Sequence, residues 1–346
     1  MSIGYSAIGW NRQKKIYDLT LFFLVIMILV GFSAISIVVH PQITAETILI
    51  RGSALTAFIL LHLVLAIGPL TRIDSRFLPL LYNRRHLGVT LFLVSLSHVI
   101  LTVFQFHALG DIPARVSFLS SYFVDYLSLG RPQYLNQIPF EPFGFLAILI
   151  FGVMALTSHD FWLKNLGSKL WKKMHLFVYF AYLLIVMHVF FGFLQSEQSW
   201  FYSLAVSLGM TGLVSLHVWA WRTDQSRKVV ATKAEDESFH LATQFSKLRE
   251  GHGTVVKVNN KKIAIFLDRG QVRALANTCR HQGGPIGEGR IIDGCVTCPW
   301  HGWQYKSDTG CSPPPFKEVI ATYPVRVVGD DVFVSEIENP LAKIEH

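Results

Sequence analysis

The stretch Cys279-Arg280-His281 is followed, after sixteen intervening residues, by Cys298-Pro299-Trp300-His301. Each stretch supplies one thiol and one imidazole from a short piece of chain. Thiolates are soft ligands and imidazoles are borderline, so a set of two and two suits either zinc or an iron–sulfur cluster. Glycines follow both stretches, and glycine lets backbone N–H groups approach the sulfur atoms of a cluster closely. The motif therefore predicts a metal centre held by Cys279, His281, Cys298 and His301.

The order of the ligands separates the two kinds of centre. Zinc fingers usually pair like with like, two cysteines in one half of the motif and two histidines in the other. In this chain each half carries one cysteine and one histidine, which is what a two-iron cluster needs if each iron is to have two ligands of one kind. We expect a [2Fe–2S] cluster that moves electrons one at a time, with a zinc site as the alternative.

The segment from about residue 238 to residue 336 resembles the Rieske ferredoxin family. The resemblance lies in the motifs Cys-Arg-His-Gln-Gly-Gly-Pro, which begins at Cys279, and Cys-Pro-Trp-His-Gly-Trp, which begins at Cys298. It implies a small all-β domain in which Cys279 and Cys298 bind one iron while His281 and His301 bind the other.

Two features set this segment apart from the quinol-oxidising Rieske proteins. Those proteins join their two cluster loops by a disulfide, for which this chain lacks the cysteines, and they place a serine where this chain has Trp303. One hydroxyl donor toward the cluster is thus missing, and fewer donors imply a lower reduction potential. The resemblance is therefore to the soluble ferredoxins and the Rieske domains of oxygenases. The two remaining cysteines, Cys295 and Cys311, are expected to be reduced and structural.

The first two thirds of the chain have the composition of a membrane protein. The whole chain of 346 residues is 51% hydrophobic and 16% charged, but residues after about Ala220 are ordinary and polar. Six apolar segments are long enough, or nearly so, to cross a hydrocarbon core about 30 Å thick. They are residues 17–39, 54–70, 86–106, 143–156, 174–194 and 201–220, of which the fourth is the shortest. We expect a six-helix transmembrane domain in residues 1–221, a charged linker in 222–237 and the all-β domain in 238–346, with no cleaved signal peptide.

Positive charges alternate between the two ends of these segments. Fourteen lysines and arginines lie at one set of ends and three at the other. The first set is Arg12, Lys14, Lys15, Arg72, Arg76, Arg84, Arg85, Lys164, Lys169, Lys172, Lys173, Arg222, Arg227 and Lys228, and the second is Arg51, Arg115 and Arg131. By the positive-inside rule both termini are cytoplasmic, in a membrane of the bacterial inner-membrane type. The net charge of +8 is then explained by topology and anionic lipid, and nucleic acid is not an expected partner.

Histidines recur inside the apolar segments, where ionisable residues are rare and usually functional. His86 and His98 lie on the third segment, and His175 and His188 lie on the fifth. These separations of twelve and thirteen residues correspond to about 18–20 Å along a helix. Two parallel helices that offer histidines at matching depths can hold two b-type hemes. Because His86 and His175 each follow two basic residues, an interfacial role is their alternative, and His62 is a weaker candidate as a ligand or as a quinone or proton contact.

This apolar half resembles the ferric-reductase-like transmembrane domain. The matching stretches are Arg84-Arg-His-Leu-Gly-Val, with His98 following, and Trp171-Lys-Lys-Met-His-Leu-Phe-Val-Tyr, with His188 following. The resemblance implies that His98, His175 and His188 are heme ligands, and its four-ligand members would add His86. One heme is therefore better supported than two. The flavin and nicotinamide module of that family is not apparent, because no glycine-rich dinucleotide motif opens a helix after a strand.

Together these features predict a membrane electron-transfer protein. A cytosolic reductase or ferredoxin would supply electrons to the cluster, and membrane heme would deliver them to a periplasmic acceptor. The outer loop of residues 107–141 is either a docking or lid element or a poorly ordered connection. The alternative is a membrane reductase that acts directly on ferric iron, copper or quinone. A Rieske oxygenase is disfavoured, because it needs a further iron site bound by two histidines and a carboxylate, and only His346 follows His301.

Overall fold

The computed structural model describes residues 12–109, 115–117, 139–194, 200–226, 229–230, 232–233, 238–300, 302–314 and 316–342. The chain forms two compact units. The helical unit consists of Tyr17–Ala66 and Arg84–Ser215, within its described residues. The β unit consists of Ile67–Asn83 together with the described parts of Met1–Ile16 and Leu216–His346.

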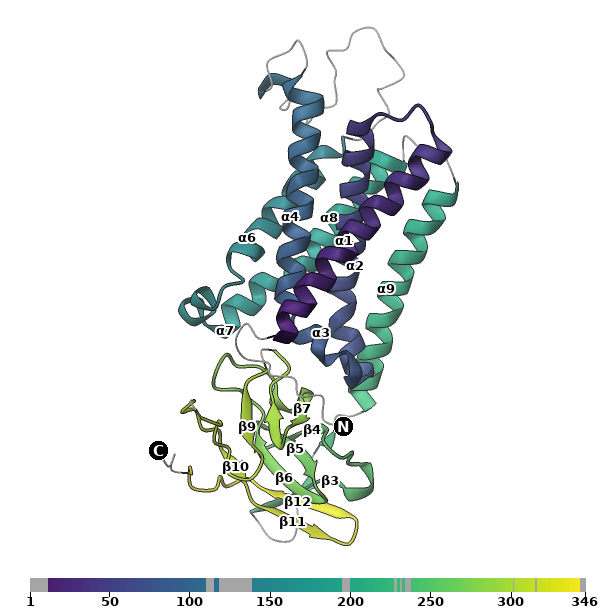
Figure 1. Cartoon of the computed structure of the whole chain (residues 1–346). Helices are drawn as coiled ribbons and strands as arrows, with labels where there is room; N and C mark the ends of the chain where they lie inside the picture. The colour runs from purple at the N-terminus through teal and green to yellow at the C-terminus, as the bar shows by residue number, and fades with distance from the viewer. Residues whose placement is uncertain are drawn as a thin grey trace. The chain divides into compact units, whose positions relative to one another are not determined.

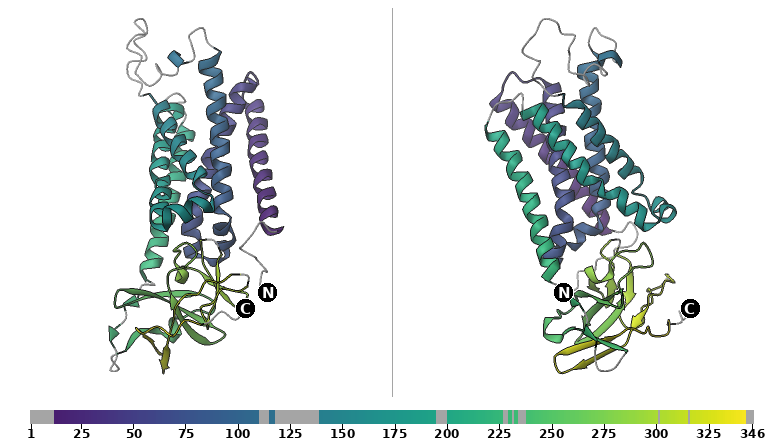
Figure 2. Two further views of the ribbon diagram at one scale, coloured as in Figure 1. Left: turned by 90° about the vertical axis from the view of Figure 1, so that its left-hand side faces the viewer. Right: turned by 180° about the vertical axis from the view of Figure 1, so that it is seen from behind.

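All six predicted apolar segments are helical in the described residues. The long helices lie side by side with their axes roughly aligned, and successive ones run in opposite directions, as the ribbon views show (Figures 1 and 2). Among the described residues, five helical stretches are long and apolar enough to cross a membrane, one of them being Leu170–Leu194, and α6 is a shorter apolar helix. The helices are α1 (Arg12–Val39), α2 (Ala45–Ile73), α3 (Leu78–Tyr82), α4 (Arg84–Val103), α6 (Glu141–Leu156), α7 (Asp160–Leu176), α8 (Val178–Val189) and α9 (Trp200–Ser226), with a 3₁₀ turn η1 (Ser75–Phe77) and π-helical ends η2 (Phe104–Ala108) and η4 (Phe190–Leu194).

The α2 helix is the most buried of the long apolar helices. In its most apolar window 39% of the residues are buried, compared with 6% in α1 and 6% in α9. Leu60, Leu61 and Leu65 of α2 are almost completely buried, whereas α1 exposes large side chains such as Ile35 and Val38. A helix backbone satisfies its own hydrogen bonds, so such apolar surfaces are stable when they face lipid. The α2 helix therefore packs against protein over much of its surface, while α1 and α9 are suited to a lipid environment.

The fifth predicted segment differs from the expected single helix beginning at residue 174. It is formed by α7 and α8, which meet at Phe177, a residue that ends one helix and begins the other. The α7 helix carries lysines, and His159 caps its N-terminus. The side chain of His159 accepts a hydrogen bond from the backbone N–H of Phe161 at 3.2 Å. The α8 helix is almost entirely apolar. His175 and His188 thus lie on either side of this break, within the single apolar helical stretch Leu170–Leu194.

The β unit contains three small sheets, nearly all of whose strand pairs are antiparallel. The first sheet has the order β1-β4-β5-β6-β10, the second β11-β12-β3-β2 and the third β7-β8-β9, and only β1 and β4 are parallel. The strands are β1 (Val229–Val230), β2 (Thr232–Lys233), β3 (Phe239–Gln244), β4 (Gly253–Val258), β5 (Lys261–Asp268), β6 (Gln271–Ala276), β7 (Arg290–Ile292), β8 (Cys295–Thr297), β9 (Gln304–Lys306), β10 (Thr322–Tyr323), β11 (Val325–Val328) and β12 (Asp331–Ser335), with 3₁₀ turns η5 (Phe245–Lys247) and η6 (Ile286–Glu288).

Strand β5 separates two hydrophobic cores. Ile263 and Ile265 belong to a core that they share with the second sheet, through residues such as Val332. Ala264 and Phe266, which alternate with them along the strand, belong to a second core with Cys279, Cys298 and Tyr305. Successive side chains of a strand point to opposite faces, so one strand supports both cores. The second core lies directly beneath the two loops that carry the cysteine and histidine motif.

Candidate functional site

The two motif loops are closed by the same pair of backbone hydrogen bonds. In the first loop, Cys279 N–H donates to the carbonyl of Gly284 at 2.8 Å, and Gly283 N–H donates to the carbonyl of Cys279 at 2.7 Å. In the second, Cys298 N–H donates to the carbonyl of Trp303 at 2.7 Å, and Gly302 N–H donates to the carbonyl of Cys298 at 2.9 Å. Gly283 and Gly302 have positive φ angles of 71° and 70°, which glycine adopts without steric cost. Each loop therefore presents its cysteine in the same backbone setting.

The loops also contact each other through their cysteines. A Cβ atom built on Gly284 would lie only 2.6 Å from the Sγ of Cys298, so the second thiol packs directly on the backbone of the first loop. Cys279 and Cys298 are each 1% exposed. A hydrogen bond from the neighbouring Cys298 thiol lowers the pKa of Cys279 to about 7. Two adjacent buried thiols, one of them easily ionised, form a donor set that fits one iron of a cluster.

Tyr305 is a residue of this site that the sequence motif does not reveal. It lies on β9, is completely buried, and places its hydroxyl 3.3 Å from the Sγ of Cys279. The backbone N–H of Arg280 donates to the same hydroxyl at 3.0 Å, which leaves the phenol proton to donate to the sulfur. Burial raises the pKa of Tyr305, so the phenol stays protonated. The sequence offered one signal for Tyr305, which is that it lies two residues after Trp303, where the second motif ends. This places it on the second strand of the β8–β9 hairpin.

The histidine side of the motif is only partly described. The ring of His281 stacks on the indole of Trp303, with centroids 4.1 Å apart and planes 7° apart. The indole N–H of Trp303 donates to the hydroxyl of Ser312 at 3.0 Å, so this residue orients a histidine rather than supplying a hydroxyl. His301 lies outside the described residues. Within the described part of the chain, no three His, Cys, Asp or Glu side chains lie close enough to share a metal ion.

The helical unit brings His98 on α4 and His188 on α8 together. Their ring centroids are 6.5 Å apart and their planes are 80° apart. A metal placed between two imidazole nitrogens at roughly 2 Å from each would separate the ring centroids by about 6.3 Å. His98 Nδ1 lies 3.1 Å from the carbonyl oxygen of Ile50, and His188 Nδ1 lies 3.0 Å from that of Phe140. With Nδ1 bonded to a carbonyl, Nε2 is left as the metal-binding nitrogen.

Gly144 on α6 makes room for this histidine pair. A Cβ atom at this position would lie 2.6 Å from Nδ1 of His188. The ring therefore packs against the α6 backbone, next to Phe140 whose carbonyl it contacts. Any side chain at residue 144 would displace the ring from its hydrogen bond. Gly144 is a second residue of the site that sequence reasoning missed, since nothing in the local pattern distinguishes it from other helix glycines.

His175 and His86 also have their Nδ1 atoms engaged. His175 Nδ1 lies 3.0 Å from the carbonyl of Trp171, and its Nε2 is buried without a hydrogen-bond partner among the described residues. A buried Nε2 of this kind would be available to bind a heme iron. His86 Nδ1 lies 2.6 Å from the carboxylate of Asp18 on α1. Arg84 and Arg85 act electrostatically on His175, which puts the start of α4 near it.

His62 differs from these four histidines because both of its nitrogens are occupied. Nδ1 lies 2.9 Å from the carbonyl of Phe58, and Nε2 lies 3.1 Å from the hydroxyl of Tyr182. A histidine held in this way has no nitrogen left for iron. His107 contacts the hydroxyl of Ser117 at 2.9 Å, and His159 caps α7. Most of the predicted outer loop of residues 107–141 lies outside the described residues.

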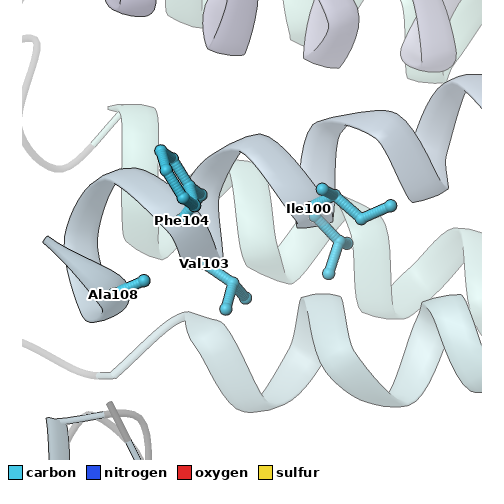
Figure 3. Close-up of a pocket in the computed structure, with 5 residues that line it drawn as sticks. Ile100, Val103, Phe104 and Ala108 are labelled. Atoms are coloured by element: carbon cyan, nitrogen blue, oxygen red, sulfur yellow. The ribbon is translucent and has the colours of Figure 1, made fainter. Parts of the chain in front are cut away.

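Two hollows lie on the helical unit. One, of about 310 Å³, is lined only by apolar side chains of α4 and η2, including Ile100, Val103, Phe104 and Ala108 (Figure 3), and offers no group that could orient a polar ligand. The other, of about 460 Å³, is lined by Val39, His40, Pro41, Gln42, Ile43, Thr47, Arg51 and Tyr202. It combines apolar and polar side chains, as ligand pockets commonly do. Arg51 directly follows Ile50, whose carbonyl contacts His98.

Comparison with protein families assigns both parts of the chain. Residues 51–186 match the ferric reductase like transmembrane component, and residues 238–324 match the Rieske [2Fe-2S] domain. The chain joins a ferric-reductase-like membrane domain to a Rieske domain. The first match covers most of α2, all of α4 and most of α8 but ends before His188, and the second covers both cysteine loops.

Several curated proteins are similar to parts of this chain. The anthranilate 1,2-dioxygenase ferredoxin subunit of Burkholderia cepacia is 29% identical over 30% of this chain and 97% of its own length. Chlorophyllide a oxygenase of Chlamydomonas reinhardtii is 35% identical over 14% of this chain, and cholesterol 7-desaturase nvd 1 of Ciona intestinalis is 32% identical over 25%. The match spans only 7% and 20% of the lengths of these two enzymes.

These findings support a multi-pass membrane protein that takes part in electron transfer. The Rieske domain supports a [2Fe–2S] cluster, and Rieske domains exchange electrons with partner reductases or oxygenases. The five long apolar helices and the ferric-reductase-like domain support the membrane location. Among these comparisons, heme is implied only by the ferric-reductase-like family.

Proposed function

We propose that this protein carries electrons, one at a time, from a cytosolic reductase or ferredoxin to an acceptor on the periplasmic side of a bacterial inner membrane. A Rieske [2Fe–2S] cluster held by Cys279, Cys298, His281 and His301 would receive the electron. The domain of residues 1–221 would carry it onward through b-type heme, and residues 222–237 would link it to the Rieske domain of residues 238–346. The charge asymmetry of the helix ends supports cytoplasmic termini.

The observation that carries the heme part of the proposal is the pairing of His98 with His188. Two histidines from different helices face each other at a separation that suits one iron atom, and each is held by a carbonyl from a third segment of chain. Such hydrogen bonds fix the tautomer and the ring orientation of a metal ligand. His175, with its buried Nε2, and His86 are the proposed ligands of a second heme.

Heme and cluster can each be tested in the purified full-length protein. Reduced-minus-oxidised absorption spectra should show b-type bands, and EPR of the dithionite-reduced protein should show the Rieske signal. Stoichiometric zinc with no Rieske signal would refute the cluster. Absence of b-type bands in protein prepared from heme-replete cells would refute the heme.

Single substitutions test which histidines bind the heme. His98→Ala and His188→Ala should each abolish the heme bound at this pair while the Rieske signal remains, because a single axial histidine holds b-type heme weakly. His107→Ala is the matched control, since His107 is a buried histidine that contacts a hydroxyl, and it should keep full heme. Full heme in both the His98 and the His188 variants would contradict the assignment.

A membrane reductase that acts directly on ferric iron, copper or quinone is a second candidate function. The observation that favours it is the mixed pocket of about 460 Å³ around Arg51, one residue from the carbonyl that contacts His98. A reductase would be reoxidised by ferric chelates, cupric ions or quinones without any protein partner, and Arg51→Gln would slow that reoxidation. If all of these acceptors leave the reduced protein unchanged, the carrier function is favoured.

A further inference from the structure

His86 differs from the other three proposed heme ligands in the group that contacts its Nδ1 atom. His98, His175 and His188 each direct Nδ1 to a neutral backbone carbonyl at 3.0–3.1 Å. His86 instead places Nδ1 2.6 Å from the Oδ1 atom of Asp18. This is the shortest of the four contacts, and its partner is a carboxylate that comes from a different helix.

Asp18 is the only acidic residue in α1. It lies two turns into a helix whose remaining length is almost wholly apolar, and its side chain is about one-third exposed, at 34%. An acidic side chain within a membrane helix is costly and generally has a functional partner. One partner of Asp18 is the imidazole of His86, sixty-eight residues away in the chain.

A carboxylate behind a metal-binding histidine has two effects. It fixes the proton on Nδ1, which leaves the Nε2 lone pair for the metal, and it makes the imidazole a stronger donor. A stronger donor and a nearby negative charge both stabilise ferric iron relative to ferrous iron, so they lower the reduction potential. A carbonyl fixes the same tautomer but adds no charge.

We propose that Asp18 is a positioning residue that orients His86 as a heme ligand and lowers the reduction potential of that heme. This rests on the proposed function, in which His86 and His175 bind heme. Arg84 and Arg85 act electrostatically on His175. Their positive charges counteract the effect of the Asp18 carboxylate on the reduction potential of the heme. Asp18 therefore keeps the heme at this end of the helices a stronger reductant than its basic surroundings would otherwise allow, which favours electron transfer away from it toward His98 and His188.

Spectroelectrochemical titration of the full-length protein measures this effect without any activity assay. Asp18→Asn keeps the size and a hydrogen-bonding oxygen but removes the charge. One heme should shift to higher potential by a change of about tenfold or more in its ferric-to-ferrous ratio, or about 59 mV, while the other heme keeps its value. Asp18→Glu should stay close to the wild-type potential, and Asp74→Asn, whose carboxylate pairs with Arg76 at 2.7 Å, should leave both hemes unchanged.

The possible outcomes separate this inference from the proposed function. Wild-type potentials in Asp18→Asn, an equal shift in Asp18→Glu, or full heme content in His86→Ala would each overturn the role of Asp18 while leaving heme at His98 and His188 intact. A wild-type protein without heme would refute the proposed function itself. The Rieske EPR signal reports folding of each variant. If Asp18→Asn does not fold, a reduced heme content in His86→Ala together with wild-type potentials in Asp18→Glu supports the proposal, and either opposite result refutes it.

Discussion

The two units hold their candidate ligands in opposite ways. In the β unit, Cys279 and Cys298 lie on two short loops, each closed by hydrogen bonds between residues four and five positions apart. In the helical unit, the carbonyl that contacts His98 and the carbonyl that contacts His188 are each forty-eight residues away in the chain. One site is built mainly by local turns and the other by the packing of helices.

This difference determines how each site responds to substitution. A loop that is closed by its own backbone keeps its shape as long as its glycines and its core remain. A histidine held by a distant helix depends on every contact that sets the distance between the helices, including glycines that carry no chemistry. The membrane site should therefore be sensitive to changes that leave all the proposed ligands in place.

The largest expected effect is in the β unit. Cys298→Ser should abolish the Rieske EPR signal and leave the b-type spectrum unchanged, because a serine hydroxyl does not replace a thiolate on iron. Cys295→Ser is the matched control. That cysteine lies three residues earlier, burial raises the pKa of its thiol, and its replacement should keep the signal. Loss of heme together with the cluster would show that the two sites are not independent.

The second-largest expected effect tests whether heme binding in the helical unit depends on the packing around His188 as well as on the ligand itself. Gly144→Ala adds a methyl group 2.6 Å from Nδ1 of His188, so the ring must move and lose its contact with the Phe140 carbonyl. Heme binding at this site should weaken by about tenfold to hundredfold, as for the loss of other outer-shell contacts. Gly88→Ala on α4 has nothing within 4 Å of the added atom and should bind heme normally. Equal heme content in the two variants would mean that the α6 backbone does not position His188.

The smallest expected effect is on the reduction potential of the cluster and not on whether the cluster assembles. Tyr305→Phe removes the hydroxyl that lies 3.3 Å from the Sγ of Cys279 but keeps the buried ring. Loss of one such hydrogen bond, worth about 0.5–1.5 kcal/mol, should lower the cluster potential by roughly 20–65 mV. Tyr323→Phe, which removes a hydroxyl that contacts Glu338, should not change it. An unchanged potential in Tyr305→Phe would show that this phenol does not donate to the sulfur.

Much of the fold was predictable because its signals are local. The six apolar segments are helical, and the family matches confirm a ferric-reductase-like domain followed by a Rieske domain. The fifth segment lies within the membrane-length helical stretch Leu170–Leu194, but its apolar character did not reveal the break at Phe177. The ligand sets and domain boundaries proposed from the sequence stay predictions, with His301 outside the described residues.

The sequence by itself determined which residue types can do redox chemistry and in which part of the chain they lie. Motif spacing and apolar length are properties of neighbouring residues, so they can be read directly. Only the tertiary structure decided that His98 lies beside His188, that the hydroxyl of Tyr182 contacts His62, and that the carboxylate of Asp18 contacts His86. These pairings depend on the rotation and depth of each packed helix, which are set by the sum of many distant contacts and leave no local mark in the sequence.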